Sequence, residues 1–314
     1  MLNVGFIGYR NHAARLLQVV EEWPAAAVRK IFHPSKTGPD LRRTKAFDSL
    51  LDCDCIFLCS PNDSHFEYVE RLKDYEGYVF CEKPPFASLQ EIDRFAFDPG
   101  RIFFNFNHRF GLLSEILAAP DKHELGELLF ADATVTHGLA YKDQYPGSWR
   151  SDIARHPNGV LETVAIHHID LFLYHLGDLR DFDFRISNSA GTGSAPDTSF
   201  ATLHFESGSH ATVRSSYAAP HVDSTTLVFA NGTVEQIDNT VTLYGPRNTF
   251  DDRGLFTAPP VRHRWQGDDL DLYLQSLRNS VFFFLETCAN RGRFADRLAR
   301  ISLLSNRLIL ERAG

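Results

Sequence analysis

A glycine-containing turn near the N-terminus has the residue types of a phosphate-binding loop. The apolar run over residues 4–7 leads into Gly-Tyr-Arg-Asn-His-Ala at residues 8–13, and apolar residues then recur at helical spacing. A strand, a glycine turn and a helix N-terminus in this order can receive the pyrophosphate of a dinucleotide. Arg10 stands where the Gly-x-Gly-x-x-Gly/Ala pattern has its second glycine, which lets the backbone approach the phosphates. The turn therefore predicts either a dinucleotide site or a plain strand-turn-helix.

Polar residues follow three further strand-like runs. They are Ser60-Pro61-Asn62 after residues 54–59, Glu82-Lys83-Pro84 after residues 78–81, and Asn107-His108-Arg109 after residues 101–106. Ligands of open α/β sheets bind outside the carboxyl ends of the strands, so these residues are expected to face a crevice. Lys83 could take part in a reaction, because a cation there favours a developing alkoxide and can relay a proton. The alternative for Lys83 is a solvated surface lysine.

His167 lies in a strongly apolar stretch, residues 161–176, which predicts a helix ended by Gly177. A histidine has a pKa near neutrality and can accept the proton of a hydroxyl, so His167 is a candidate general base. Asp170 follows one helical turn later and could orient His167. His168 is rotated by about 100° and is expected to be structural. The alternative for His167 is a buried histidine that hydrogen-bonds the backbone.

Taken in chain order, these motifs resemble the Gfo/Idh/MocA family of glucose-fructose oxidoreductases, inositol dehydrogenases and rhizopine catabolism proteins. The motifs are Gly5-Phe6-Ile7-Gly8, the run from Ser60 to His65, Cys81-Glu82-Lys83-Pro84, the run from Asn105 to Phe110, Gly159-Val160-Leu161 and His167-His168-Ile169-Asp170. The resemblance covers nearly the whole chain and implies NAD(P)-dependent redox chemistry at a sugar or cyclitol carbinol. It also implies that Lys83 reaches the nicotinamide ribose and the reacting hydroxyl, and that His167 faces the nicotinamide as general base.

Three positions depart from the expected pattern. Thr163 stands where the resembled family has an aspartate, four residues before the histidine, and it cannot stabilise an imidazolium as a carboxylate does. His33 stands where many Rossmann enzymes place an acid for the adenosine ribose, so a 2′-phosphate is not repelled and Lys36 could bind it. With Arg10 as the third departure, NADP is slightly favoured over NAD. The alternative is a relaxed site that is no longer used.

Two sets of binding residues follow from these positions. The predicted cofactor-binding residues are Gly8, Tyr9, Arg10, Asn11, His33, Ser35, Lys36, Ser60, Pro61, Asn62, His65, Glu82 and Lys83. The predicted substrate-binding residues are Asn107, Arg109, Tyr141, Trp149, Arg150, Thr163 and His167. Aromatic rings stack on sugar faces and arginine binds phosphate bidentately, so Arg109 and Arg150 would suit a nucleotide-sugar or a sugar acid. Packing within the loop is the alternative for Tyr141 and Trp149.

The elements that must position these residues fall into two halves. Residues 1–115 alternate strand-like and helix-like runs, which predicts a doubly wound parallel sheet, a dinucleotide-binding Rossmann domain. Its strands are expected near residues 4–7, 26–32, 45–47, 54–59, 78–81 and 101–106, and its helices near 12–22, 64–72 and 88–96. Asp63 or Ser64 is expected to cap the second helix.

Residues 116–314 are expected to form an α/β domain for substrate binding and oligomerisation, with an open, mostly antiparallel sheet. Strands are expected near residues 128–135, 182–186, 198–205, 210–217, 225–229, 233–237 and 241–244, and helices near 161–176, 268–289 and 294–312. Asn231-Gly232 is a hairpin turn signal. The resemblance implies homodimers or homotetramers that pack through sheet faces.

Composition limits the class of protein. With 314 residues, 43% hydrophobic and 23% charged, the chain is an ordinary globular protein of one large domain or two. The net charge of -8 argues against a nucleic-acid partner. No apolar run approaches the roughly 20 residues of a membrane span, and no signal sequence precedes the first strand, so a cytoplasmic protein is expected. The five cysteines indicate unpaired thiols, and Cys53 and Cys55 are expected to pack in a strand and bind no metal.

These features favour an NAD(P)-dependent oxidoreductase. It would transfer a hydride between nicotinamide and a carbinol of a sugar or nucleotide-sugar, with Lys83 and His167 handling the proton. One alternative is a non-catalytic ligand-binding or regulatory protein that kept the fold, for which Thr163 and Arg10 are the reasons. Another is a lyase or glycosidase that uses NAD(P) without net redox change. Fold alone does not decide between these classes.

Overall fold

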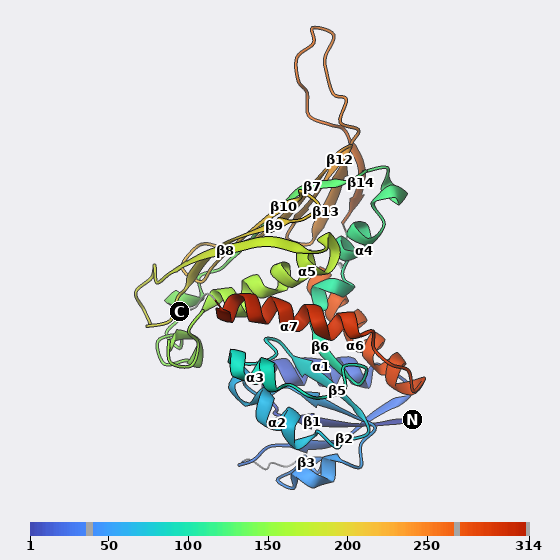
Figure 1. Cartoon of the computed structure of the whole chain (residues 1–314), viewed down its shortest axis with the longest axis vertical. Helices are drawn as coiled ribbons and strands as arrows, with labels where there is room; N and C mark the ends of the chain where they lie inside the picture. The colour runs from blue at the N-terminus through green and yellow to red at the C-terminus, as the bar shows by residue number, and fades with distance from the viewer. Residues whose placement is uncertain (36–39, 267–270, 312–314) are drawn as a thin grey trace. The chain divides into compact units, whose positions relative to one another are not determined.

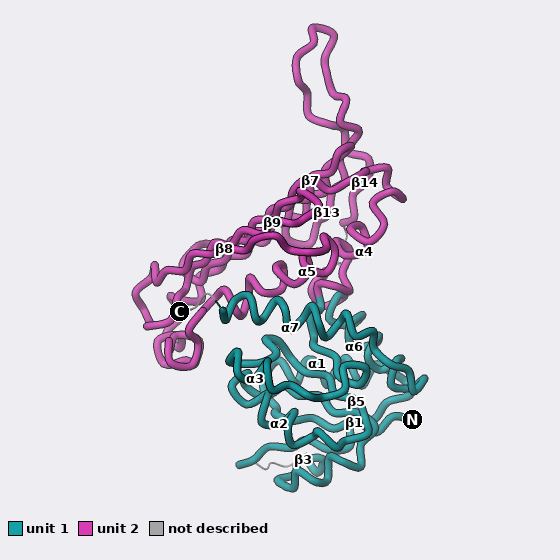
Figure 2. Tube along the Cα trace, viewed as in Figure 1, with its two compact units in different colours: residues 1–107, 276–311 teal, residues 108–275, 312–314 magenta. Residues whose placement is uncertain are grey.

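The computed structural model describes residues 1–35, 40–266 and 271–311, which fall into two compact units (Figure 2). The first unit comprises residues 1–107 and 276–311, and the second comprises residues 108–275. The observed division after residue 107 lies near the predicted one after residue 115. Residues 276–311, which the sequence assigned to the second domain, instead belong to the first unit.

The first unit is built on a six-stranded parallel sheet with the strand order β3-β2-β1-β4-β5-β6 (Figure 1). Its strands are β1 (Leu2–Ile7), β2 (Ala26–Phe32), β3 (Arg43–Thr44), β4 (Cys55–Leu58), β5 (Tyr78–Glu82) and β6 (Ile102–Asn105). The strand order reverses between β1 and β4, and the carboxyl ends of the strands at such a switch point bind ligands in doubly wound folds. The predicted parallel Rossmann sheet is confirmed.

The third strand of this sheet lies earlier than predicted. Residues 45–47 do not pair, because the Ala46 N–H donates to Thr44 Oγ1 and turns the chain out of the strand. Phe47 instead starts a 3₁₀ turn (Phe47–Leu50), and its buried ring meets Phe32 edge-on with centroids 5.4 Å apart. A single buried aromatic ring thus gave this short segment its strand-like pattern.

The helices before residue 100 start in different ways. They are α1 (Asn11–Glu21), α2 (His65–Arg71) and α3 (Leu89–Arg94). Ser88 and Glu91 form a complete capping box at α3. Ser64 precedes α2 without the predicted side-chain cap, because its hydroxyl donates to the Pro61 carbonyl oxygen at 2.7 Å.

Two C-terminal helices complete the first unit. They are α6 (Leu272–Ala289), which belongs to the unit from Ser276 on, and α7 (Asp296–Glu311). The Phe284 ring lies 5.2 Å from Phe57 on β4 and 5.3 Å from Phe80 on β5, between ring centroids. Asn306 Oδ1 accepts the Phe86 N–H at 2.9 Å. These contacts stabilise the first sheet with distant sequence, which places the helices outside the domain predicted for them.

The second unit is built on an eight-stranded sheet with the order β14-β13-β12-β11-β7-β10-β9-β8. Its strands are β7 (Leu128–Thr136), β8 (Leu179–Ser187), β9 (Thr198–Phe205), β10 (His210–Ser216), β11 (Val222–Phe229), β12 (Gly232–Ile237), β13 (Thr240–Tyr244) and β14 (Val261–Trp265). Strands β7 and β10 pair in parallel, and the other neighbours pair antiparallel. The mostly antiparallel sheet is confirmed.

One strand of this sheet was missed. The edge strand β14 is exposed along nearly its whole length and has few apolar residues, so its sequence carries no strand pattern. The connection from β13 to β14 projects away from the sheet (Figure 1). Asn231 lies in the two-residue connection between β11 and β12, as the hairpin signal predicted.

The helix predicted over residues 161–176 changes its winding part-way. Leu161–Ala165 form a π-helix and Ile166–Leu176 form α5, which Gly177 ends with a φ of +88°. This left-handed conformation favours glycine. The π-helix contacts β9 and β10, so the helix packs on one face of the second sheet. Short π-helical segments are frequent at functional sites, and this one carries Thr163.

The five cysteines are free thiols, and all but Cys59 are buried. Burial raises the pKa of the Cys53 thiol to about 11 and raises that of Cys81 well above its ordinary value. Neutral thiols of this kind pack as small apolar groups. Within the described ranges, no group of three His, Cys, Asp or Glu side chains is placed to hold a metal ion. The same ranges contain no helix with the length and apolar character needed to cross a bilayer.

Candidate active site

The turn between β1 and α1 has the geometry of a phosphate-binding loop. Gly8 has a φ of +84°, and a Cβ there would lie 3.0 Å from the carbonyl oxygen of Cys59, so glycine is required. Arg10 is the exposed N-cap of α1, without a side-chain capping hydrogen bond, and no acid stands in the first turn. The first N–H groups of α1 therefore keep their positive potential for an anion. Since the Arg10 side chain lies at the surface and adds a cation, the turn fits a dinucleotide pyrophosphate.

The carboxyl end of β2 has no acid where an adenosine ribose would be bound. His33 follows this strand, and its Nδ1 accepts the Ser35 N–H at 3.2 Å. The Arg43 guanidinium lies over the Tyr9 ring, 5.1 Å from the centroid. His33, Tyr9 and Arg43 are neutral or cationic, which suits a 2′-phosphate better than an acid would. Lys36, the residue predicted to bind that phosphate, lies outside the described residues.

His65 connects the ends of β4 and β5. It is buried, with its Nε2 3.0 Å from the Ser60 carbonyl oxygen and its Nδ1 3.1 Å from the Pro84 carbonyl oxygen. Burial lowers the pKa of His65, and the contacts of its ring with the Ser60, Pro84 and Pro85 carbonyl oxygens oppose that shift. His65 thus holds both loops in position, and the buried Asn62 starts a 3₁₀ turn (Asn62–Ser64) in the first of them.

Glu82 and Lys83 stand at the carboxyl end of β5. Glu82 is buried, with its Oε1 2.9 Å from His12 Nε2 and 2.8 Å from Asn105 Nδ2. Burial alone would raise the pKa of Glu82, but His12, Asn105 and Lys83 together hold it below its ordinary value. Glu82 is therefore an ionised neighbour of the half-buried Lys83. The sequence identified Glu82 and Lys83 but not the partners His12 and Asn105, although both lie in the motifs quoted above.

Asn107 is buried where the first unit ends. Its Nδ2 donates to Ser276 Oγ at 2.7 Å, where α6 enters the same unit. This hydrogen bond joins residues that are 169 positions apart in the sequence. The structure thus gives Asn107 a structural contact, and its predicted contact with substrate stays a prediction.

Arg109 and Asp170 form a buried ion pair within the second unit. Nε and Nη2 of Arg109 donate to the two carboxylate oxygens of Asp170 at 2.7 and 2.6 Å, and the side chains are 2% and 0% exposed. The guanidinium also lies 4.9 Å from the centre of the Tyr174 ring. Arg109 therefore anchors α5, and its predicted contact with a substrate stays a prediction. Both oxygens of Asp170 accept from Arg109, and its predicted role of orienting His167 stays a prediction.

Three histidine rings meet at the start of α5. His108 is stacked on His167 with centroids 4.7 Å apart, and His168 meets His108 edge-on at 4.8 Å. His167 is half-buried, whereas His168 is buried with its Nε2 3.2 Å from Thr225 Oγ1. Burial lowers the pKa of His168 to about 4, which agrees with the structural role expected of it. His108 was not among the predicted site residues, although it stands beside Asn107 in the sequence.

We expect the His168→Gln variant to lose less stability than the wild type between pH 7 and pH 5. The folded protein keeps His168 neutral down to about pH 4, whereas the unfolded chain takes up the proton below its ordinary pKa of 6.5. Protons that only the unfolded state binds lower the free energy of unfolding as the pH falls, by about 2 kcal/mol at pH 5 for this residue. Urea unfolding at both pH values measures the loss. Equal losses in the two proteins would contradict the low pKa.

Thr163, on the π-helix, belongs to a hydrogen-bonded row of side chains. Its Oγ1 lies 2.6 Å from Tyr217 Oη and donates to the Gly159 carbonyl oxygen at 3.2 Å. Tyr217 is buried and also hydrogen-bonds Arg150. Burial raises the pKa of the Tyr217 phenol, and the hydrogen bonds with Thr163 and Arg150 oppose that rise. A neutral hydroxyl is thus fixed at the position of the expected aspartate, by a tyrosine that the sequence did not reveal.

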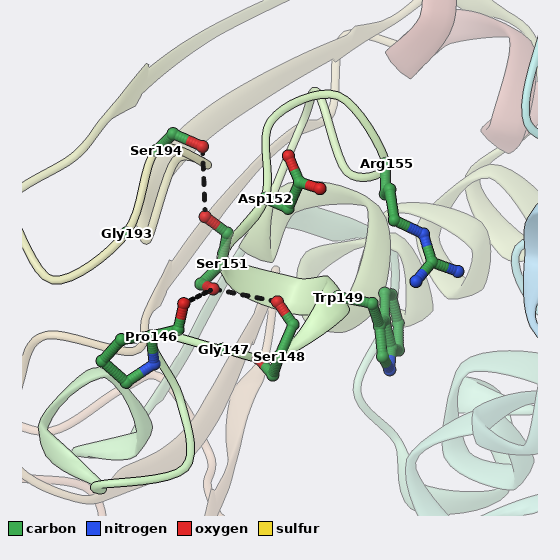
Figure 3. Close-up of a pocket in the computed structure, with 9 residues that line it drawn as sticks. All are labelled: Pro146, Gly147, Ser148, Trp149, Ser151, Asp152, Arg155, Gly193 and Ser194. Carbon is green, nitrogen blue, oxygen red and sulfur yellow. Dashed lines mark hydrogen bonds between the residues drawn. The ribbon is translucent and has the colours of Figure 1, made fainter.

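Trp149 lines an open pocket of the second unit (Figure 3). The pocket has a volume of about 360 Å³ and is lined by Pro146, Gly147, Ser148, Trp149, Ser151, Asp152, Arg155, Gly193 and Ser194. The Arg150 guanidinium lies over the Trp149 ring, 4.3 Å from its centroid. Tyr141 is 64% exposed at the end of a 3₁₀ turn (Leu139–Tyr141). Trp149 thus contacts Arg150, and Tyr217 connects Arg150 with Thr163, whereas Tyr141 is exposed.

Most of the chain matches the sequence models of one oxidoreductase family. A model of the oxidoreductase family with an NAD-binding Rossmann fold matches residues 2–96, and a GFO/IDH/MocA C-terminal domain matches residues 115–250. The chain belongs to the Gfo/Idh/MocA oxidoreductase family. The resemblance inferred from the motifs is therefore confirmed, and the first unit contains the Rossmann fold of this NAD-binding family.

Relatives of this Gfo/Idh/MocA protein include enzymes of different reaction types. Inositol 2-dehydrogenase from Rhizobium meliloti is 24% identical over 173 residues, 54% of this chain and 49% of that protein. The 2,7-anhydro-N-acetylneuraminate hydratase of Escherichia coli is 25% identical over 232 residues, 68% of this chain and 61% of that protein. The chain spans about half the length of the inositol dehydrogenases that it matches. Levoglucosan dehydrogenase, solved with NADH and levoglucosan, shares the fold with a TM-score of 0.78 at 20% identity, covering 99% of this chain and 96% of that one.

Proposed function

We propose that this protein is an NAD(P)-dependent oxidoreductase that transfers a hydride between nicotinamide and a carbinol carbon of a sugar or nucleotide-sugar. The observation that carries the proposal is the glycine turn with its uncapped, acid-free helix N-terminus, in a chain of an NAD-binding oxidoreductase family. Relatives named for inositol and levoglucosan support a polyhydroxylated substrate.

Two side chains are proposed to handle the proton of the reacting hydroxyl. When bound, the nicotinamide cofactor supplies or accepts the hydride. The ammonium of Lys83 would stabilise the oxygen as its proton leaves, and the ionised Glu82 beside it favours the charged form of that lysine. His167 would accept the proton from the hydroxyl, with its ring held by the stacked His108. Thr163 can hydrogen-bond a substrate but cannot offset the charge of a protonated His167.

Titration of the purified protein with NADPH and with NADH, followed by nicotinamide fluorescence, tests the proposal. We expect saturable binding of at least one dinucleotide below millimolar concentration. Absence of binding of either at millimolar concentration would overturn both enzyme interpretations and favour a non-catalytic binding protein.

A reaction without net redox change is the second candidate. One relative that matches 68% of this chain is named a hydratase, and hydration does not change the oxidation state of the substrate overall. A cofactor that is retained through purification and is unchanged after turnover would favour this candidate. Stoichiometric conversion of NADPH or NADH with substrate would favour the dehydrogenase.

NADP is proposed as the slightly preferred cofactor, and Lys36→Asp tests this preference. We expect the variant to bind NADPH about tenfold more weakly while NADH binding changes little, because the new carboxylate repels only the 2′-phosphate. The same fluorescence titrations measure both affinities. Lys73→Asp, at an exposed position after α2, is the matched control. An unchanged ratio of NADPH to NADH affinity in Lys36→Asp would remove this role of Lys36.

Two further properties are proposals. We propose association into homodimers or homotetramers through the face of the second sheet opposite its buried side, where Phe130 and Phe200 are 44% and 41% exposed. We also propose a cytoplasmic location, which the five free thiols support.

A further inference from the structure

Arg150 is a half-buried cation that has no carboxylate partner in the described part of the chain. Two contacts within the second unit fix its guanidinium. It lies over the Trp149 ring, 4.3 Å from the centroid, and it hydrogen-bonds the phenol of Tyr217. A guanidinium has five N–H donors, so donors remain for a ligand after the bond to Tyr217.

The carboxylates of Glu162 and Asp197 have partners other than Arg150. Glu162 Oε1 lies at ion-pair distance from His156 Nδ1, 2.6 Å, and both side chains are buried. Asp197 accepts two backbone N–H groups at 2.8 Å and the Thr198 hydroxyl at 2.9 Å. Neither carboxylate forms an ion pair with Arg150 in the described part of the chain.

His137 lies beside this cluster and senses the charge of Arg150. Burial lowers the pKa of His137, and the charges of His221 and Arg150 lower it further. The His137 ring lies 5.0 Å from Tyr217, the same residue that Arg150 contacts. Thr163, which hydrogen-bonds Tyr217, adds a neutral hydroxyl and no carboxylate to this cluster.

We propose that Arg150 binds an oxyanion of the substrate, which makes an anionic sugar the substrate class of this enzyme. The oxyanion is either the carboxylate of a sugar acid or the phosphate of a sugar phosphate, since both accept two parallel hydrogen bonds from a guanidinium. Tyr217 positions the guanidinium and Thr163. This inference rests on the proposed function only for the reaction that follows binding, because every residue it uses lies in the second unit.

Isothermal titration calorimetry of the full chain with D-glucuronate, D-glucose 6-phosphate and D-glucose tests the proposal, with and without saturating NADPH. At low salt we expect at least one of the two anions to bind tenfold or more tightly than glucose, and the stronger one identifies the oxyanion. Arg150→Gln should remove this preference, and Arg150→Lys should keep part of it. Equal affinities, absence of anion binding in the wild type or an unchanged preference in Arg150→Gln would overturn the proposal.

Two further arginine-to-glutamine variants serve as controls for Arg150→Gln. Arg185→Gln, at a side chain that is 79% exposed, should leave the preference unchanged. Arg155→Gln tests the neighbouring pocket of Figure 3, and loss of the preference in this variant instead of Arg150→Gln would overturn the proposal. Nicotinamide fluorescence separates the two hypotheses. Dinucleotide binding without an anion preference refutes only the Arg150 site, whereas an anion preference without dinucleotide binding refutes only the redox function.

Discussion

The Asp170→Asn variant is expected to lose about 3–5 kcal/mol of unfolding free energy. Asp170 accepts two hydrogen bonds from Arg109, and neither side chain is more than 2% exposed. Removing the carboxylate charge leaves the Arg109 guanidinium buried without its counter-ion, and the desolvation of that charge is no longer offset. Because the pair anchors α5, which carries His167, the effect should extend to the position of that histidine.

Urea unfolding of the variant against the wild type measures this effect. Asp183→Asn removes a carboxylate from an exposed pair with Arg185 and should cost about 1 kcal/mol or less. The double variant Arg109→Met/Asp170→Leu should be more stable than Asp170→Asn, because it leaves no buried charge. If Asp170→Asn fails to fold, a folded double variant still supports the explanation. A loss below about 1 kcal/mol for Asp170→Asn would refute it.

The secondary structure of the first unit could largely be predicted, because it depends on local patterns. Strands β4 and β6 are buried at every residue, and each appears in the sequence as an apolar run, which in β6 ends at Asn105. Alternation of such runs with helical spacing is enough to indicate a parallel doubly wound sheet. The carboxyl ends of the strands then follow from chain direction alone, which is why the position of Lys83 could be predicted.

Contacts between distant residues could not be predicted in this way. Asn107 and Arg109 carry groups suited to substrate binding, but their hydrogen-bond partners lie 169 and 61 residues away in the sequence. Residue type shows what a side chain can bind and does not show which internal partner has already bound it. The helices α6 and α7 joined the first unit for a similar reason, since an apolar helix face, such as that with Phe284 in α6, can pack on either sheet.

The residues that the sequence did not reveal are those that contact and position the predicted site residues. His12 and Asn105 set the charge of Glu82, His108 holds the ring of His167, and Tyr217 fixes Thr163. No recognisable sequence spacing links any of these residues to its partner, because each contacts that partner only in the folded chain. Tyr217 also changes the meaning of the departure at Thr163. The Thr163 hydroxyl is held between the phenol of Tyr217 and the Gly159 carbonyl oxygen, so it has a fixed place in the second unit.

Lys83→Ala is expected to lower turnover by about a thousandfold or more while dinucleotide binding largely survives. The ammonium is the proposed stabiliser of the alkoxide, and groups of this kind contribute about 3–4 kcal/mol to the transition state. The loss is increased by Glu82, which would remain ionised through His12 and Asn105 and would then oppose a developing negative charge. The binding turn around Gly8 is untouched, so NADPH or NADH affinity should change little.

Steady-state kinetics with the sugar that the wild type converts, together with nicotinamide fluorescence, measures the two quantities separately. Lys73→Ala, at an exposed lysine after α2, is the control for loss of a positive charge and should retain wild-type turnover. The combination Glu82→Gln/Lys83→Ala should be less impaired than Lys83→Ala, because the opposing charge is gone. Wild-type turnover in Lys83→Ala would refute the role of this lysine. Equal loss in turnover and in cofactor affinity would instead identify Lys83 as a residue that only binds the dinucleotide.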